Sequence, residues 1–210
     1  AGVPLVVCIL AALAIGAAVG YLNGFIVTKM KLPPFIATLG AMKILRSVTQ
    51  YFMQTNSPKV PSDFLQIASV KIGGQMLMPV FYWLLLAVIL YIVSKKTVFG
   101  RHVFAVGSNE KTTRLSGINV NRVKLGVYAL MGAVVAVAAL LQVSRIGAMD
   151  PANAGNGYEL DAIAAVIVGG TSMSGGKGSV VGTVFGMLII AVMNNLLNLL
   201  GVDPFLREAF

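Results

Sequence analysis

Carboxylates are scarce in this chain, and two of them stand where they could do chemistry. Only seven of the 210 residues are Asp or Glu, and Glu159 and Asp161 open an apolar run, Leu160–Gly170. If that run enters a membrane, its ionisable groups are functional candidates and could couple a proton or another ion to transport. Carboxylates in the first turn of a helix also stabilise its N-terminus. Both interpretations remain open, with the role at the helix terminus favoured.

Amide side chains gather near the end of the last long apolar run, Val180–Leu200. Asn194, Asn195 and Asn198 lie in its final third, and Asn194 and Asn198 share a face because they are four residues apart. Such amides could line a polar path for a hydroxylated solute, or they could bind neighbouring helices. The sequence leaves these two roles open.

The sequence does not contain the residues that other catalytic or metal-binding sites would need. His102 is the only histidine and Cys8 the only cysteine, which leaves a zinc ion without ligands and the chain without an internal disulfide. Nothing indicates a Ser/His/Asp arrangement around His102, which lies in a basic loop. We therefore expect no catalytic residue, no metal and no enzymatic activity.

The string GGTSMSGGKGS, at Gly169–Ser179, has the composition of a phosphate-binding loop but not its spacing. A P-loop needs Gly, four residues, Gly, Lys and then Ser or Thr, whose hydroxyl meets magnesium. Here Thr171 occupies the first glycine position, and Gly178 follows Lys177. The string is expected to form a tight glycine turn between two short helices, and no cofactor is expected in this chain.

The composition indicates a protein whose solvent is a lipid bilayer. Apolar residues make up 57% of the chain and charged residues 11%, whereas soluble domains average about 25% charged residues. The net charge of +9 does not indicate nucleic-acid binding, because the basic residues stand at the ends of apolar runs and form no stripe with interleaved aromatics. We therefore expect the chain to contact membrane lipid and to bind no nucleic acid.

A basic loop, Lys95–Lys124, predicts the topology. It separates two apolar runs, Met76–Val93 and Leu125–Val143, and contains seven of the sixteen basic residues: Lys95, Lys96, Arg101, Lys111, Arg114, Arg122 and Lys124. Lys and Arg are retained on the cytoplasmic side during insertion, so the loop is expected to be cytoplasmic. Lys29 and Lys31 lie two crossings earlier and fall on the same side, which agrees with this topology.

The first run, Val3–Val27, is long enough to span a membrane with tilt. Gly16, Gly20 and Gly24 repeat at every fourth position and predict a smooth face where another helix backbone can approach closely. Pro33-Pro34 then stops the helix.

The next run, Phe35–Phe52, carries Lys43 and Arg46, and cations are costly beside lipid at mid-depth, so we expect an interior helix. Residues 54–75 and 145–158 are predicted to be external loops. Because Leu160–Gly170 is too short to span, residues 159–179 are interpreted as a short or broken helix running inward, with Lys177 at the cytoplasmic face.

Within the basic loop, Glu110–Leu115 is predicted to form one or two helical turns. Ser108 or Asn109 can cap its N-terminus, and Gly117 can end it. A short capped helix is a rigid element that a soluble partner can grip. We expect Arg114 and Leu115 to form that contact, one through charge and the other as an apolar anchor.

Four strings in this chain resemble one family of membrane proteins. They are PPFIATLGAMKILR, AVGSNEKTTRLSGINVNRVK, GYELDAIAAVIVGGTSMSGGKGSVVGT and NNLLNLLGV. Their order resembles the permease subunits of bacterial ABC importers for monosaccharides of the ribose, galactose and xylose type, and the resemblance covers nearly the whole chain. Lys43 departs from the apolar or small residue expected from that family.

The resemblance implies a type II importer permease in the bacterial cytoplasmic (inner) membrane. Its implied partners are a second permease subunit, in a homo- or heterodimer, a cytoplasmic ABC ATPase that binds ATP and magnesium, and a periplasmic or lipid-anchored sugar-binding protein. The family's coupling helix corresponds to Gly107–Asn119 and docks on the ATPase. Family members carry further helices before Ala1 and usually one after Phe210, so the chain is interpreted as a fragment.

The predicted fold is an all-α, polytopic transmembrane helix bundle, a single permease domain over residues 1–210, with a short broken helix and a cytoplasmic coupling helix. The residues expected to couple to the ATPase are Gly107, Ser108, Asn109, Glu110, Arg114, Leu115 and Gly117. The residues that could line a translocation path are Glu159, Asp161, Asn194, Asn195 and Asn198. An alternative function is an ion-coupled secondary transporter or channel that uses Glu159 and Asp161.

Overall fold

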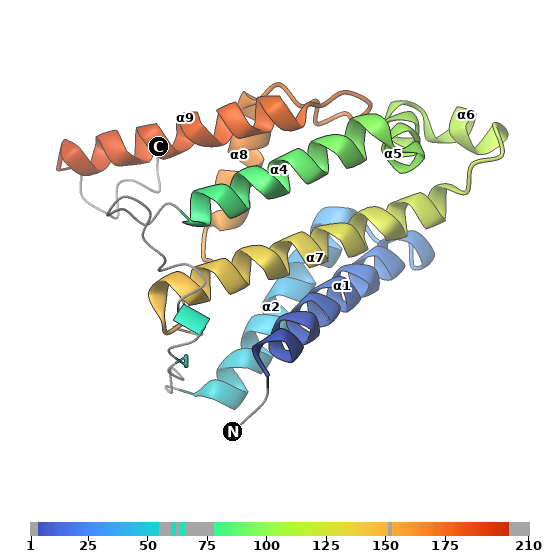
Figure 1. Cartoon of the computed structure of the whole chain (residues 1–210). Helices are drawn as coiled ribbons and strands as arrows, with labels where there is room; N and C mark the ends of the chain where they lie inside the picture. The colour runs from blue at the N-terminus through green and yellow to red at the C-terminus, as the bar shows by residue number, and fades with distance from the viewer. Residues whose placement is uncertain (1–3, 55–59, 62–63, 66–77, 151–152, 202–210) are drawn as a thin grey trace. The chain divides into compact units, whose positions relative to one another are not determined.

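The described part of the chain is built from α-helices. The computed structural model describes residues 4–54, 60–61, 64–65, 78–150 and 153–201. The helices are α1 (Leu5–Lys29), α2 (Pro34–Met53), α4 (Met78–Lys96), α5 (Val98–Ser108), α6 (Glu110–Leu115), α7 (Val120–Ile146), α8 (Tyr158–Val168) and α9 (Val180–Leu199) (Figure 1). No strand occurs among these residues. The prediction of an all-α bundle is confirmed.

Four of the helices that the structure describes are long and apolar enough to cross a membrane, namely α1, α4, α7 and α9. The chain is therefore a multi-pass membrane protein. Helix α8 has 11 residues, about 17 Å at 1.5 Å per residue, which is too short to span alone. The prediction of a short helix before the glycine turn is confirmed.

The described residues fall into two compact units. The first comprises α1, α2, the beginning of α4 and α7, within Ala1–Leu85 and Gly117–Ala154. The second comprises the rest of α4, α5, α6, α8 and α9, within Leu86–Ser116 and Gly155–Phe210. Each unit is held together by its own pair of tightly packed helices.

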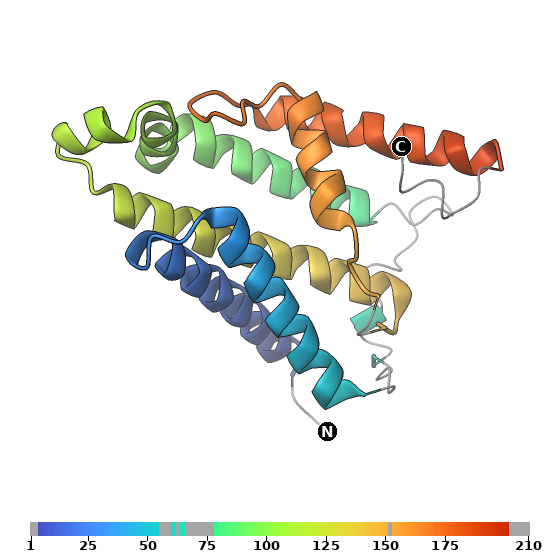
Figure 2. The ribbon, with the colours of Figure 1, turned by 180° about the vertical axis from the view of Figure 1, so that it is seen from behind.

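In the first unit, α1 packs on α7, as the views from the front and from behind both show (Figures 1 and 2). Glycines of both helices form the contact. A methyl group built on Gly16 would lie 2.6 Å from the carbonyl oxygen of Gly132, and one on Gly20 would meet the carbonyl of Tyr128. Small residues let the two backbones approach closely, which is how helices associate inside lipid. The predicted glycine face of α1 is confirmed, with α7 as its partner.

Two hydrogen bonds, one of them buried, join the end of α7 to the segment after α2. The Ser144 hydroxyl donates a hydrogen bond to the carbonyl oxygen of Phe64 at 2.7 Å. The backbone N–H of Val60 donates to the carbonyl of Gly147 at 3.2 Å. Both predicted external loops therefore meet at the same end of this unit, although most of residues 54–75 lie outside the described residues.

Helix α2 differs from its prediction as an interior helix. Only Ala37 of this helix is buried among the described residues, and Lys43 is exposed. Among the described helices, α2 makes its largest contact with α1. Arg46 is half-buried, and its Nη2 donates to the carbonyl oxygen of Ala154 at 3.3 Å. The predicted end of the preceding helix is confirmed, since α1 stops at Lys29 and Pro34 opens α2.

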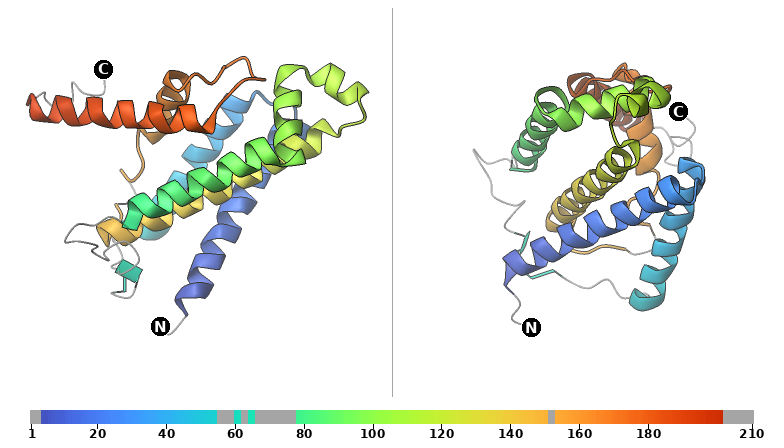
Figure 3. Two further views of the ribbon diagram at one scale, coloured as in Figure 1. Left: turned by 45° about the horizontal axis from the view of Figure 1, so that its top comes forward. Right: turned by 90° about the vertical axis from the view of Figure 1, so that its right-hand side faces the viewer.

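In the second unit, α8 packs on α9 with the same small-residue chemistry. A methyl group on Gly169 would meet the backbone of Gly182, and one on Gly186 would meet the carbonyl oxygen of Ala165. Figure 3 shows α8 beside α9. The backbone contact fixes the short helix to the long one, so α8 does not have to span the membrane to be held in place.

We expect Gly20→Leu to weaken the α1–α7 pair, because the new side chain would have to displace the backbone of α7. Overpacking of this kind costs about 1–3 kcal/mol of stability. Thermal unfolding of the full-length protein in detergent measures the effect. Gly40→Leu is the matched control, since nothing lies within 4 Å of a methyl group built on Gly40. Equal melting temperatures for the two variants would contradict the packing role of Gly20.

Candidate functional site

The short helix α6 forms in the basic loop as the sequence predicts. Asn109 is its N-cap, and its side-chain oxygen accepts a hydrogen bond from the backbone N–H of Thr112 at 3.0 Å. Ser108 is the last residue of α5 and does not cap α6. Gly117 follows the helix with φ +82°, a left-handed conformation that favours glycine. The bounds Glu110–Leu115 agree with the prediction.

Two predicted contact residues differ in their surroundings. Arg114 pairs with Glu110 across one turn, with 3.4 Å between its Nη2 and Oε1 of Glu110. An exposed pair at this spacing contributes about 0.3–0.5 kcal/mol to helix stability. Leu115, by contrast, is 88% exposed, the highest value among the large apolar residues that the structure describes. Helix α6 therefore presents one uncovered apolar side chain on an otherwise polar, capped element.

Helix α5 was not expected, because its residues were interpreted as part of a basic loop. Thr97 caps it by accepting a hydrogen bond from the N–H of Gly100 at 3.1 Å. Gly100 is buried against the carbonyl oxygens of Val93 and Ser94, so α5 folds back tightly from the end of α4. The sequence did contain a signal: the apolar residues Phe99, Val103 and Val106 stand at positions i, i+4 and i+7, which is helical spacing.

The end of α5 lies against the glycine turn that joins α8 to α9. A methyl group on Gly107 would lie 2.7 Å from the backbone nitrogen of Gly176, and one on Gly176 would lie 2.8 Å from Cα of Ser108. Gly175 and Gly176 have φ of 86° and 74°. We call this backbone contact between Gly107–Ser108 and Gly175–Gly176 the glycine junction. It brings two of the predicted coupling residues, Gly107 and Ser108, to the turn that the sequence predicted without a partner.

The glycine turn is itself closed by backbone hydrogen bonds. The N–H of Ser172 donates to the carbonyl of Lys177 at 3.0 Å, and the N–H of Gly175 donates to the carbonyl of Ser172 at 3.1 Å. Ser179 then caps α9 by accepting from the N–H of Gly182 at 3.3 Å. The path from α6 through α5 and the turn to α9 is therefore a series of short, backbone-defined contacts within one unit.

Three of the predicted path residues line one cavity of about 560 Å³ between α8 and α9: Glu159, Asp161 and Asn194. We call it the carboxylate cavity, and its wall also includes Asn156, Tyr158 and Leu197. Asn195 and Asn198 are not among its lining residues, so only one of the three asparagines is brought to the carboxylates. Carboxylate and amide groups can exchange hydrogen bonds with hydroxyl groups.

Both carboxylates belong to the first turn of α8. The N-cap position is Gly157, with no side-chain capping bond, so Glu159 and Asp161 act on the helix terminus through their charge. Among the described residues, no group of three or more His, Cys, Asp or Glu side chains could hold a metal ion. The cavity can therefore offer charge and hydrogen bonds to a solute, and the helix-terminus role does not exclude this.

Comparison with known proteins links these features to one class of membrane transporter. The family model described as "Branched-chain amino acid transport system / permease component" matches residues 1–210. The ribose import permease protein RbsC of Escherichia coli K12 is 45% identical over 95% of this chain. The galactose/methyl galactoside import permease protein MglC of the same strain is 38% identical over 98% of it, and the fructose import permease protein FrcC of Rhizobium meliloti 36% identical over 97%.

The chain is shorter than these relatives. It spans 63% of the length of RbsC and of MglC, and 58% of the length of FrcC. No solved structure matches the chain. The family model covers all described helices, and the relatives are 36–45% identical to the chain. The chain therefore belongs to the branched-chain amino acid transport system permease family, in agreement with its spanning helices.

Proposed function

We propose that the chain is the transmembrane part of a permease subunit in an ATP-driven monosaccharide importer of the bacterial inner membrane. The relatives are named as import permeases for ribose, fructose and galactose, and they support this assignment. They give no support to the ion-coupled alternative based on Glu159 and Asp161. The observation that carries the proposal is α6, a capped helix with an uncovered apolar residue.

The proposed role of α6 is to dock on a cytoplasmic ATPase. Its basic surroundings favour a cytoplasmic position, and Asn109 and Gly117 hold its ends. Burying Leu115 in a partner's groove would contribute about 1.5–3 kcal/mol. Arg114, already oriented by Glu110, can add a charged contact at the rim of that interface. The partner supplies ATP and magnesium, and this chain is a non-catalytic subunit.

The proposed route from docking to transport runs through the glycine junction. At Gly107 and Gly176 the backbones are in contact without intervening side chains, which leaves little room for independent movement. A shift of α5 and α6 would therefore move the turn and, through it, the N-terminus of α9. Because α8 is fixed to α9 at Gly169 and Gly182, the shift would reach the carboxylate cavity as well.

The carboxylate cavity is the proposed part of the sugar path in this chain. A monosaccharide presents several hydroxyl groups, which can donate to Glu159 and Asp161 and accept from the Asn194 amide. Asn195 and Asn198 remain candidates for contacts elsewhere along α9. A second permease subunit and a periplasmic or lipid-anchored sugar-binding protein complete the proposed assembly, in which that second subunit is a copy of this one or a related chain.

We expect Leu115→Asp to abolish sugar uptake and the stimulation of ATP hydrolysis by sugar in the assembled complex. A buried carboxylate without a partner would oppose docking, while the caps of α6 would keep the helix folded. Uptake into vesicles and phosphate release measure the two effects. Leu115→Met, which keeps an apolar side chain of similar volume, is the matched control. Coupling at the wild-type level in the Asp variant would refute the docking role.

Gly107→Ala is expected to reduce uptake about tenfold while the ATPase remains bound. The added methyl group would push against the backbone of Gly176, a contact that cannot be relieved by a side-chain rotation. Co-purification of the ATPase together with uptake separates assembly from coupling. Gly40→Ala serves as the control because its surroundings are open. Unchanged uptake in Gly107→Ala would show that the glycine junction does not transmit movement.

A further inference from the structure

A second cavity, of about 500 Å³, is lined by three cations that the transport route does not use. They are Lys95 at the end of α4, Arg101 on α5 and Lys177 in the glycine turn. We call it the basic cavity, and its other lining residues are Ser94, Phe104, Gly176 and Gly178. No carboxylate lines it, and all of its residues belong to the second unit.

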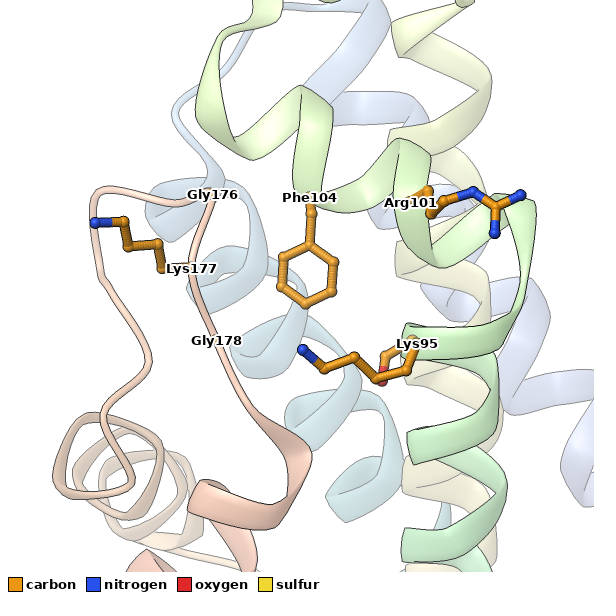
Figure 4. A pocket seen from close by; sticks show the side chains of 7 residues that line it. Lys95, Arg101, Phe104, Gly176, Lys177 and Gly178 are labelled. Atoms are coloured by element: carbon orange, nitrogen blue, oxygen red, sulfur yellow. The ribbon is translucent and has the colours of Figure 1, made fainter.

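Among the residues that the structure describes, none of the three cations forms an ion pair with a carboxylate. Figure 4 shows how the cations are arranged: Lys95 extends beneath the ring of Phe104 toward the backbone at Gly178, and Arg101 and Lys177 lie on the two flanks and point outward. Nζ of Lys95 is 5.7 Å from the centre of the Phe104 ring. All three cations are exposed, and of the three Lys95 lies nearest the Phe104 ring.

Backbone donors add to this positive wall. The N–H groups of Gly176, Lys177 and Gly178 donate to no acceptor within the described residues. Successive amides in a glycine-rich turn form concavities that accept the oxygens of an anion. With Lys95 beside them, these amides can supply both hydrogen bonds and charge to a tetrahedral oxyanion.

The depth of the cavity identifies the source of such an anion. Helix α4 is long and apolar enough to span the membrane, and Lys95 lies in its last turn. The cavity therefore opens where the apolar span ends, which is the level of the lipid headgroups. The basic residues predict that this is the cytoplasmic face, where basic pockets between spanning helices bind anionic headgroups.

We propose that the basic cavity binds the phosphate group of an anionic phospholipid. The phosphate would lie between Nζ of Lys95 and the amides of the glycine turn, with Arg101 and Lys177 approaching from the rim. The acyl chains would remain beside α4. A bound headgroup would connect the glycine turn to α4 and α5 by non-covalent contacts, next to the glycine junction. This binding does not depend on the transported solute.

Native mass spectrometry of the full-length permease, mixed with phosphatidylglycerol or with phosphatidylcholine in neutral detergent, tests the proposal. The test variant combines Lys95→Gln, Arg101→Gln and Lys177→Gln. The control combines Lys29→Gln, Lys31→Gln and Lys96→Gln, which removes the same charge from exposed residues outside the cavity. We expect the wild type and the control to retain phosphatidylglycerol over phosphatidylcholine, and the test variant to lose about a hundredfold in affinity.

Two further measurements test the folding of the variant and the source of the phosphate group. Lys177→Gln alone changes one exposed loop residue, so folding should be intact, and about a fivefold loss of affinity is expected. An excess of inorganic phosphate distinguishes the two sources of the phosphate group. If it displaces the bound lipid at millimolar concentration, the cavity is a site for free phosphate and the lipid assignment fails. Equal retention of phosphatidylglycerol by the wild type and the triple variant would overturn the proposal altogether.

Discussion

Close approach of one glycine backbone to another is the interaction on which the described structure depends. Lipid tails are as apolar as leucine, so apolar side chains alone give helices little reason to associate within a bilayer. The α1–α7 pair is closed at Gly20 and Gly132, and the α8–α9 pair at Gly169 and Gly182. The glycine junction applies the same contact to the boundary between α5 and the turn. Each unit therefore keeps its shape through positions where even one methyl group would not fit.

Such contacts also explain how a small helix could control a transport path. Side-chain packing can yield by rotation, whereas a backbone-to-backbone contact transmits displacement directly. In the second unit the path from α6 to α9 consists of capped helix ends and glycine contacts, with Asn109 and Ser179 as caps. The basic cavity lies against the same turn, so the proposed lipid headgroup and the proposed ATPase would both act on one segment.

The sequence was sufficient for the elements that depend on local chemistry. The bounds of α6 followed from Asn109 and Gly117, the shortness of α8 from its eleven apolar residues, and the packing face of α1 from three glycines in register. The sequence was insufficient for contacts between residues that are far apart in the chain. Nothing local pairs Gly107 with Gly176, brings Asn194 but not Asn198 to the carboxylates, or leaves Lys43 exposed. Helix α5 was not predicted, because its cations indicated a polar loop and the helical spacing of its apolar residues was not considered.

The short length of α8 has a consequence for the energetics of a solute in the path. The α9 residues that line the carboxylate cavity, from Ile190 to Leu197, lie about 15–26 Å along α9 from its first residue, so the cavity lies beside the half of α9 that is farther from the glycine turn. Two carboxylates beside a membrane-spanning helix require water or polar partners to remain solvated. The short helix α8 thus leaves polar side chains lining a recess beside α9, where a spanning apolar helix would present only apolar side chains. The proposed sugar substrate would exchange water for similar hydrogen bonds there, and this exchange would lower its desolvation barrier.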